Sequence, residues 1–155
     1  MFYKCSSPDI LLPVQKWTLE SNDTWHLYYS DGDDNAYHRA YTYGRTGKIF
    51  LPGTSDVILT VSAPTITYTS YIYGGAYGIE IAGFNGNTRT VIDSANASYA
   101  GKTYKISQKD YDFIEVNTSM TGCGYRWPPG TSYDNWEVAR AYNNIELYYT
   151  EQFVY

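Results

Sequence analysis

Few of the 155 residues belong to the types that carry out covalent catalysis. The chain holds two histidines, two cysteines and no Gly-x-Ser-x-Gly elbow of the kind that exposes a nucleophilic serine. Four carboxylates are candidates for the acid and base of a glycosidase: Glu80, Asp93, Asp112 and Glu115. Their spacing along the chain does not predict that any two of them meet across a sugar bond. We therefore expect a protein that is not an enzyme and that needs no cofactor.

A metal site is the second chemistry that the residue types allow. Asp31, Asp33 and Asn35 have the spacing of the first half of a calcium-binding loop. The match fails further on, because Ala36 stands where that loop needs glycine and Thr42 where it needs a bidentate glutamate. A solvated turn is the favoured interpretation, and a calcium site assembled from separate loops stays open. The few histidines and cysteines do not predict a structural zinc site.

Aromatic side chains are the most distinctive feature of the composition, with 19 tyrosines and four tryptophans. Two sets of them stand beside polar residues and are the candidate ligand-binding residues. The first set occupies alternate positions of residues 36–45 and therefore shares one face of an expected strand: Tyr37, Arg39, Tyr41, Tyr43 and Arg45. The second set lies in and just beyond an expected loop over residues 121–135: Tyr125, Trp127, Tyr133 and Trp136.

Three interpretations of these two sets stay open. Sugar rings have apolar faces that stack on aromatic rings, while their hydroxyls bind Arg, Asn and Asp side chains. Tyr, Trp and Arg also dominate the energy of protein–protein contacts. The third interpretation is that the rings fill the core of a tyrosine-rich fold.

The charge balance limits the classes of partner. A net charge of −5 and a pI near 4.8 argue against nucleic acid, because affinity for phosphate depends on clustered Lys and Arg. Charged residues make up 17% of the chain, so Ser, Thr, Asn and Tyr must provide much of the solubility. No apolar run is long enough to span a membrane, and the N-terminus lacks the apolar core of a secretory signal. We expect no nucleic-acid partner and no membrane insertion.

Residues 102–120 show the period-two alternation of strands most clearly. Tyr104 and Ile106 alternate with polar residues, a polar turn follows at residues 108–112, and Ile114 and Val116 resume the alternation. The same pattern returns in residues 143–150. Runs of this kind share one core only as a sheet, so we expect them in one layer of a sandwich.

The rest of the chain predicts about eight to ten short strands, without a helical period or a domain linker. The local expectations are a strand over 56–62 with Val57, Leu59 and Val61 inward, two strands over 17–30 with a turn at 21–23, a turn or bulge at Gly74-Gly75, and a hairpin turn at Asn85-Gly86. We predict an all-β protein, a single-domain antiparallel β-sandwich of the jelly-roll type over residues 17–155. An extended N-terminal arm over residues 1–16 precedes it.

Residues 100–150 resemble galactose-binding-like jelly-roll modules. The resemblance rests on the turn and strand from Tyr104 to Val116 and on the closing strand Asn143-Asn-Ile-Glu-Leu. It implies a jelly roll and carbohydrate binding. Secreted modules of this group carry a signal peptide, and the chain departs from them in lacking one.

Composition and the missing signal together indicate a virion protein. A chain poor in charge and rich in Tyr, Thr, Asn and Gly resembles proteins that work outside cells, yet this one starts at its own Met1. Virion proteins reach the extracellular space by lysis and need no secretion. We therefore predict a non-catalytic phage or viral structural protein: a capsid decoration, fibre or tail/baseplate component.

The expected partners follow from that role. The sandwich would dock to other virion proteins through an edge strand or the N-terminal arm, and would form a homo-oligomer, with a trimer favoured. Its aromatic loops would face outward, where cell-surface glycans are a further ligand class. The alternative function is a stand-alone carbohydrate-binding module or lectin.

Overall fold

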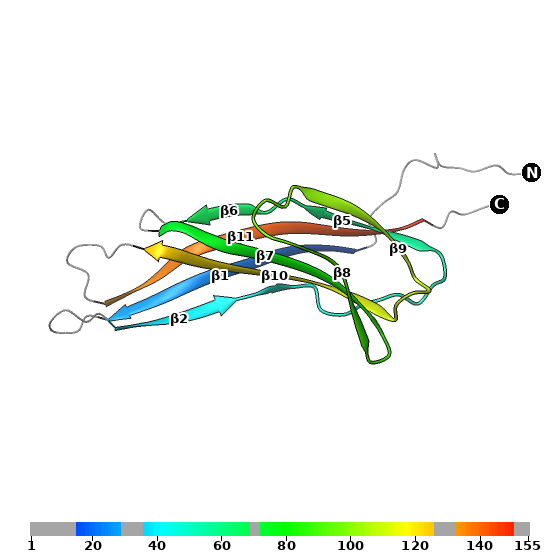
Figure 1. Cartoon of the computed structure of the whole chain (residues 1–155), viewed down its shortest axis with the longest axis horizontal. Helices are drawn as coiled ribbons and strands as arrows, with labels where there is room; N and C mark the ends of the chain where they lie inside the picture. Colours follow the sequence, from blue (N-terminus) through cyan, green and yellow to red (C-terminus); the bar gives the residue numbers. More distant parts are fainter. Residues whose placement is uncertain (1–14, 29–35, 69–71, 126–132, 151–155) are drawn as a thin grey trace, which may run out of the picture.

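The computed structural model describes residues 15–28, 36–68, 72–125 and 133–150. Within these ranges the chain forms eleven β-strands and no helix, and the strands stack as two layers (Figure 1). The described ranges accordingly hold no helix that could cross a membrane. The first strand begins at Gln15, so the expected arm over residues 1–16 lies almost entirely outside the described residues.

Both layers are antiparallel sheets. The six-stranded sheet has the order β2-β1-β11-β5-β9, with β6 also paired to β11. Its strands are β1 (Gln15–Tyr28), β2 (Ala36–Thr42), β5 (Asp56–Ser62), β6 (Thr65–Tyr68), β9 (Gly101–Ser107) and β11 (Tyr133–Tyr149). The five-stranded sheet has the order β3-β10-β7-β8, with β4 also paired to β10. Its strands are β3 (Gly44–Arg45), β4 (Ile49–Phe50), β7 (Ile72–Asn85), β8 (Thr88–Ala95) and β10 (Phe113–Tyr125).

The strands pair from the ends of the chain inward, which is the topology of a jelly roll. β1 pairs with β11, β3 with β10, β5 with β9 and β7 with β8. The path through β1-β11-β5-β9 lies in one sheet and the path through β3-β10-β7-β8 in the other. The predicted all-β jelly-roll sandwich is therefore confirmed.

The predicted alternation places the core between the two sheets. The inward side chains are buried in both layers: Val57, Leu59 and Val61 of β5, and Ile114, Val116 and Thr118 of β10. Their neighbours in sequence are only partly buried, as expected for strands with one face outward. Each buried aliphatic side chain contributes about 1.5–3 kcal/mol, so the alternation itself determines which face of each strand turns inward.

The two strands of residues 102–120 are present, but they lie in different layers. β9 pairs with β5 in the six-stranded sheet, whereas β10 pairs with β7 in the five-stranded sheet. The turn between them crosses from one sheet to the other. The Gln108 amide donates to the Ser55 carbonyl at 3.2 Å, and the Asp112 amide donates to the Phe84 carbonyl at 2.7 Å. The prediction of a shared layer is wrong, because period-two alternation does not distinguish the strands of one sheet from those of the other.

β1 runs without a turn through residues 21–23. Ser21 and Asp23 are fully buried, and Asp23 Oδ2 accepts a hydrogen bond from the Gly122 amide of β10 at 2.9 Å. The predicted turn is wrong here, because a polar side chain that is bonded across the sandwich can occupy an inward position. A β-bulge between Asp23 and Thr24 marks the place in sequence instead.

Gly74-Gly75 lies within β7, where its pairing with β10 has no register shift, so the predicted turn or bulge is wrong. Gly75 faces Gly122 in register, and a Cβ atom on Gly75 would come within 2.4 Å of the Thr121 carbonyl oxygen and 2.5 Å of the Tyr68 ring. Glycine is needed there for the close approach of neighbouring groups. The predicted hairpin is present, with its turn one residue further on: Asn85 pairs with Thr88, and the turn is formed by Gly86, at φ 60°, and Asn87.

A polar bridge joins the two sheets inside the sandwich. The Tyr77 hydroxyl of β7 donates to Asn143 Oδ1 of β11 at 2.6 Å. Asn143 Nδ2 in turn donates to the Ser62 carbonyl of β5 at 3.0 Å. Burial raises the pKa of Tyr77, so its hydroxyl remains a donor. Both side chains are buried, so these two hydrogen bonds connect the sheets inside the core.

Candidate binding face on the five-stranded sheet

The first predicted aromatic set spans the place where the chain leaves one sheet for the other. β2 ends at Thr42 opposite Asn22 of β1, and β3 begins at Gly44 opposite Thr118 of β10. The expected single strand over residues 36–45 is therefore wrong. Tyr43 stands between the two strands, which makes this stretch the connection between the layers.

Three residues of this set form an exposed row. The Tyr41 and Tyr43 ring centroids are 6.4 Å apart, and the Arg45 guanidinium carbon lies 5.1 Å from the Tyr43 centroid. Tyr41 is 40% exposed and Tyr43 is 49% exposed. These two rings do not fill the core, so a contact role remains for them. Tyr37 and Arg39 lie further back on β2, opposite Leu27 and Trp25 of β1.

The second set lies mostly on strands, because the expected loop over residues 121–135 is shorter than predicted. β10 continues to Tyr125, opposite Ile72, and β11 starts at Tyr133. Trp136 lies inside β11 opposite Trp25 of β1. Trp127 lies outside the described residues, as does the expected calcium loop over residues 31–35.

A groove of about 290 Å³ crosses the outer face of the five-stranded sheet. Two residues of the first aromatic set, Tyr43 and Arg45, line it together with the candidate carboxylate Glu80. The sequence analysis did not select the other three polar lining residues, Ser94, Asn117 and Ser119. Four of these positions stand in one register row, in which Asn117 faces both Arg45 and Glu80, and Glu80 faces Ser94. Small residues hollow the groove: a Cβ atom on Gly78 would lie 3.0 Å from Ser119 Oγ.

The groove is lined by two charged residues, Glu80 and Arg45, and they differ in whether they form an ion pair. The Glu80 carboxylate forms an ion pair with the Arg89 guanidinium of β8. Arg45, on the opposite side, has no ion pair within the described part of the chain, and its guanidinium lies against the Tyr43 ring. Of the two charged residues that line the groove, Arg45 is therefore the one without an ion pair in the described part of the chain.

An aromatic row crosses the same outer face nearer the β7–β8 hairpin. We use this name for Phe50, Phe113 and Phe84, which are register neighbours on β4, β10 and β7. Phe84 and Phe113 stack with centroids 4.6 Å apart, and Phe50 meets Phe113 edge-on at 5.9 Å. Phe50 is 62% exposed. The row is thus a packed apolar ridge that faces water.

Two cationic side chains lie beside the aromatic row. Lys48 Nζ lies 4.9 Å from the Phe113 centroid, and the Arg89 guanidinium carbon lies 5.9 Å from the Phe84 centroid. The alternation in sequence places Phe113 on the outward face, but the register between strands is what joins it to Phe50 and Phe84. That register was not available from the sequence, so the row was missed.

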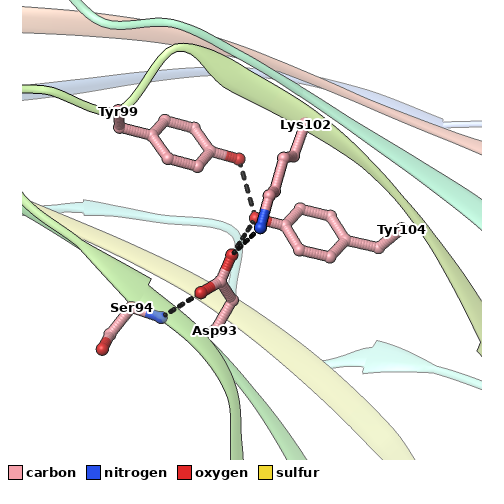
Figure 2. Close-up of polar contacts among 5 residues, drawn as sticks. All are labelled: Asp93, Ser94, Tyr99, Lys102 and Tyr104. Carbon is pink, nitrogen blue, oxygen red and sulfur yellow. Dashed lines mark hydrogen bonds and ion pairs between the residues drawn. The ribbon is translucent and has the colours of Figure 1, made fainter.

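A tyrosine clasp closes the edge of the sandwich between β8 and β9 (Figure 2). The Tyr104 hydroxyl donates to Asp93 Oδ2 at 2.6 Å, and the Tyr99 and Tyr104 hydroxyl oxygens are 2.9 Å apart. Lys102 Nζ lies 3.6 Å from the same carboxylate oxygen, and the Ser94 amide donates to Asp93 Oδ1 at 2.9 Å. Because β8 and β9 belong to different sheets, these bonds tie the layers together at their open edge.

The pKa shifts in the clasp favour a structural role. The hydrogen bond from Tyr104, together with the charge of Lys102, holds the pKa of Asp93 below its ordinary value. Burial and the bond to Asp93 raise the pKa of Tyr104, and burial raises that of Tyr99. The carboxylate therefore stays ionised and the phenols stay protonated across the neutral range, which is the condition for a lasting donor–acceptor pair.

Metal ligation has no evident place among these side chains. The described residues contain no group of three or more His, Cys, Asp and Glu side chains that could hold an ion. The outer face of the five-stranded sheet presents exposed rings, hydroxyls, an amide and a guanidinium without an ion pair in the described residues. No family model, curated protein or solved structure matches the chain.

Proposed function

We propose that the chain is a non-catalytic structural protein of a phage or virus particle. It assembles as a homo-oligomer and docks onto other virion proteins, as a capsid decoration, fibre or tail/baseplate component. The observation that carries the proposal is the aromatic row, whose Phe50 ring is 62% exposed on a sheet face. A contiguous apolar ridge of this kind favours a protein contact, because a partner removes it from water.

The occupant that the charges favour is a second copy of the chain. Lys48 lies beside the rings of the aromatic row and Glu115 lies on the same outer face, and neither forms an ion pair within the described residues. An isologous contact needs one patch that complements itself. Apolar rings with both signs of charge around them meet that need.

Fold and composition support the virion role by analogy. Jelly rolls form viral capsid and lectin domains, so the topology agrees with both candidate functions. The low charged fraction of 17% and the 19 tyrosines suit a surface that works by packing against partners. The location that follows is the virion, which is extracellular after lysis.

The second candidate is a stand-alone carbohydrate-binding module or lectin. The observation that favours it is the groove, where an exposed tyrosine stands beside an amide, two serine hydroxyls and a guanidinium. Sugars are recognised by such a combination of ring and hydrogen-bonding groups. The resemblance of residues 100–150 to galactose-binding-like modules points the same way.

Light scattering after size-exclusion chromatography tests the first candidate. The wild-type protein should elute with the mass of two or more chains, each of 17.7 kDa. Phe50→Asp places a charge at the exposed end of the aromatic row and should weaken association about 10- to 100-fold, the equivalent of about 1.5–3 kcal/mol for one buried ring.

Thr103→Asp is the matched control, because it adds the same charge to an exposed position of the six-stranded sheet. It should leave the mass unchanged. A wild-type protein that stays at the mass of one chain at every concentration would contradict the proposal, as would equal dissociation by both variants.

A further inference from the structure

Arg45 carries a positive charge that no carboxylate of the described residues pairs with. Its guanidinium carbon lies 5.1 Å from the Tyr43 ring, which occupies one side of the group, and no described carboxylate is within ion-pair distance. A guanidinium binds a carboxylate through two parallel hydrogen bonds. The free edge of Arg45 at the groove is therefore suited to an anionic oxygen pair from a ligand.

The opposite side of the groove does not cancel this charge. Glu80 is the acid that lines it, and the ion pair with Arg89 already neutralises that carboxylate. Within the register row from Arg45 to Ser94, the charge that has no ion pair in the described residues therefore lies at the Arg45 end. An anionic group on a ligand would bind at that end and a neutral group at the other.

The floor between the two ends is made of hydroxyl and amide groups. Asn117 and Ser119 of β10 and Ser94 of β8 line it, and their side chains form no hydrogen bond to another described residue. Such groups both donate and accept, so they match the hydroxyls of a sugar ring. Gly78 keeps the floor open, because a side chain there would meet Ser119.

We propose that the groove binds a single saccharide unit that carries a carboxylate, of the uronic acid class. Its carboxylate pairs with Arg45, its hydroxyls bond to Asn117 and the serines, and Tyr43 flanks the ring. The volume of about 290 Å³ lies at the lower end for ligand pockets and suits one sugar unit. This inference rests on the second candidate function, glycan binding, and is independent of self-association through the aromatic row.

Titration of the full chain followed by amide NMR tests the inference, with sodium glucuronate as the acidic probe and glucose as its neutral counterpart. Glucuronate should bind about tenfold more tightly than glucose, with shifts at Asn117, Ser119 and Gly78. Arg45→Gln should lower glucuronate affinity about tenfold and leave glucose affinity unchanged, because one charge-assisted contact is lost. Ser119→Leu fills the groove and should abolish the binding of both sugars.

Lys105→Gln is the matched control, since it removes the same charge from the outer face of the six-stranded sheet. It should change neither affinity.

Equal affinities for the two sugars, both abolished by Ser119→Leu, would keep glycan binding and overturn the carboxylate assignment. No binding of either sugar would overturn the glycan function together with this inference. A short acidic peptide that shifts the groove amides when glucuronate does not would assign the groove to a protein partner and overturn the inference.

Discussion

The two outer faces of the sandwich differ in how far their side chains bind one another. On the six-stranded sheet, Tyr148 donates to Glu146 at 2.5 Å, and Thr18 donates to Asn144 at 3.2 Å. Two ion pairs on that face join Arg140 to Glu20 at 3.2 Å and Lys105 to Asp56 at 3.4 Å. The five-stranded sheet instead carries the aromatic row, whose Phe50 ring is exposed, and a guanidinium without an ion pair in the described residues.

The difference between the two faces indicates where a partner would gain most free energy on binding. Both sheets turn aliphatic side chains inward, so packing explains the core equally well on either side. The outward positions are free of that requirement. A face whose polar groups already bond to each other gains little from a partner, whereas an exposed apolar ridge gains when water leaves it. We therefore assign binding to the five-stranded sheet and solvation to the six-stranded sheet.

Asn143→Ala should have the largest effect, because it removes the buried bridge that joins the two sheets. The substitution removes the bridge from Tyr77 to Ser62 and leaves a buried hydroxyl and a carbonyl without their partner. The free energy of unfolding should fall by about 2–3 kcal/mol, measured by urea denaturation. Asn144→Ala, on the outer face of the same strand, should cost less than about 0.5 kcal/mol. Equal losses for the two variants would contradict the bridge.

Tyr104→Phe tests the clasp at the edge where the two sheets meet, with an expected loss of about 1 kcal/mol at neutral pH. Asp93 has a lowered pKa when folded, so its contribution is present above its unfolded value of 3.8 and is lost as the pH falls further. Tyr104 has a raised pKa when folded, so its contribution is present below 10.0 and is lost as the pH rises above it.

Urea midpoints measured from about pH 2 to pH 11 should therefore fall at both ends in the wild type and fall less steeply in Tyr104→Phe. The clasp would be contradicted by wild-type and variant curves that run parallel over the whole range.

Glu20→Gln should have the smallest effect and sharpens the comparison from the solvated side. Its carboxylate pairs with Arg140 on the exposed face of the six-stranded sheet. Exposed pairs contribute little, so stability should change by less than about 0.5 kcal/mol and the mass by light scattering should not change. If Glu20→Gln instead lowered the mass to that of one chain, the contact surface would have to lie on the six-stranded sheet.

The fold was largely predictable because local patterns determine which side of a strand is buried. Val57, Leu59, Ile114 and Val116 are inward as predicted, and the predicted hairpin forms with its turn at Gly86-Asn87. Sheet membership was not predictable in this way, since alternation is the same in both layers. Asp23 shows a second limit: its inward position depends on the Gly122 amide, which is distant in sequence.

The candidate site was predictable only in part. Tyr43 and Arg45 were selected from their residue types and do lie on the groove. Glu80 and Asn117 join them through strand register, and Phe50 joins Phe113 in the same way. Register arises from the packing of whole strands against each other, so no local pattern predicts which outward residues become neighbours.

The most direct test of the assignment is a map of amide NMR shifts as the wild-type chain is concentrated. The account predicts shifts at Phe50, Phe84 and Phe113 of the five-stranded sheet, and unchanged amides at Thr18 and Asn144 of the six-stranded sheet. Shifts confined to Thr18 and Asn144, or a spectrum that does not change with concentration, would contradict it.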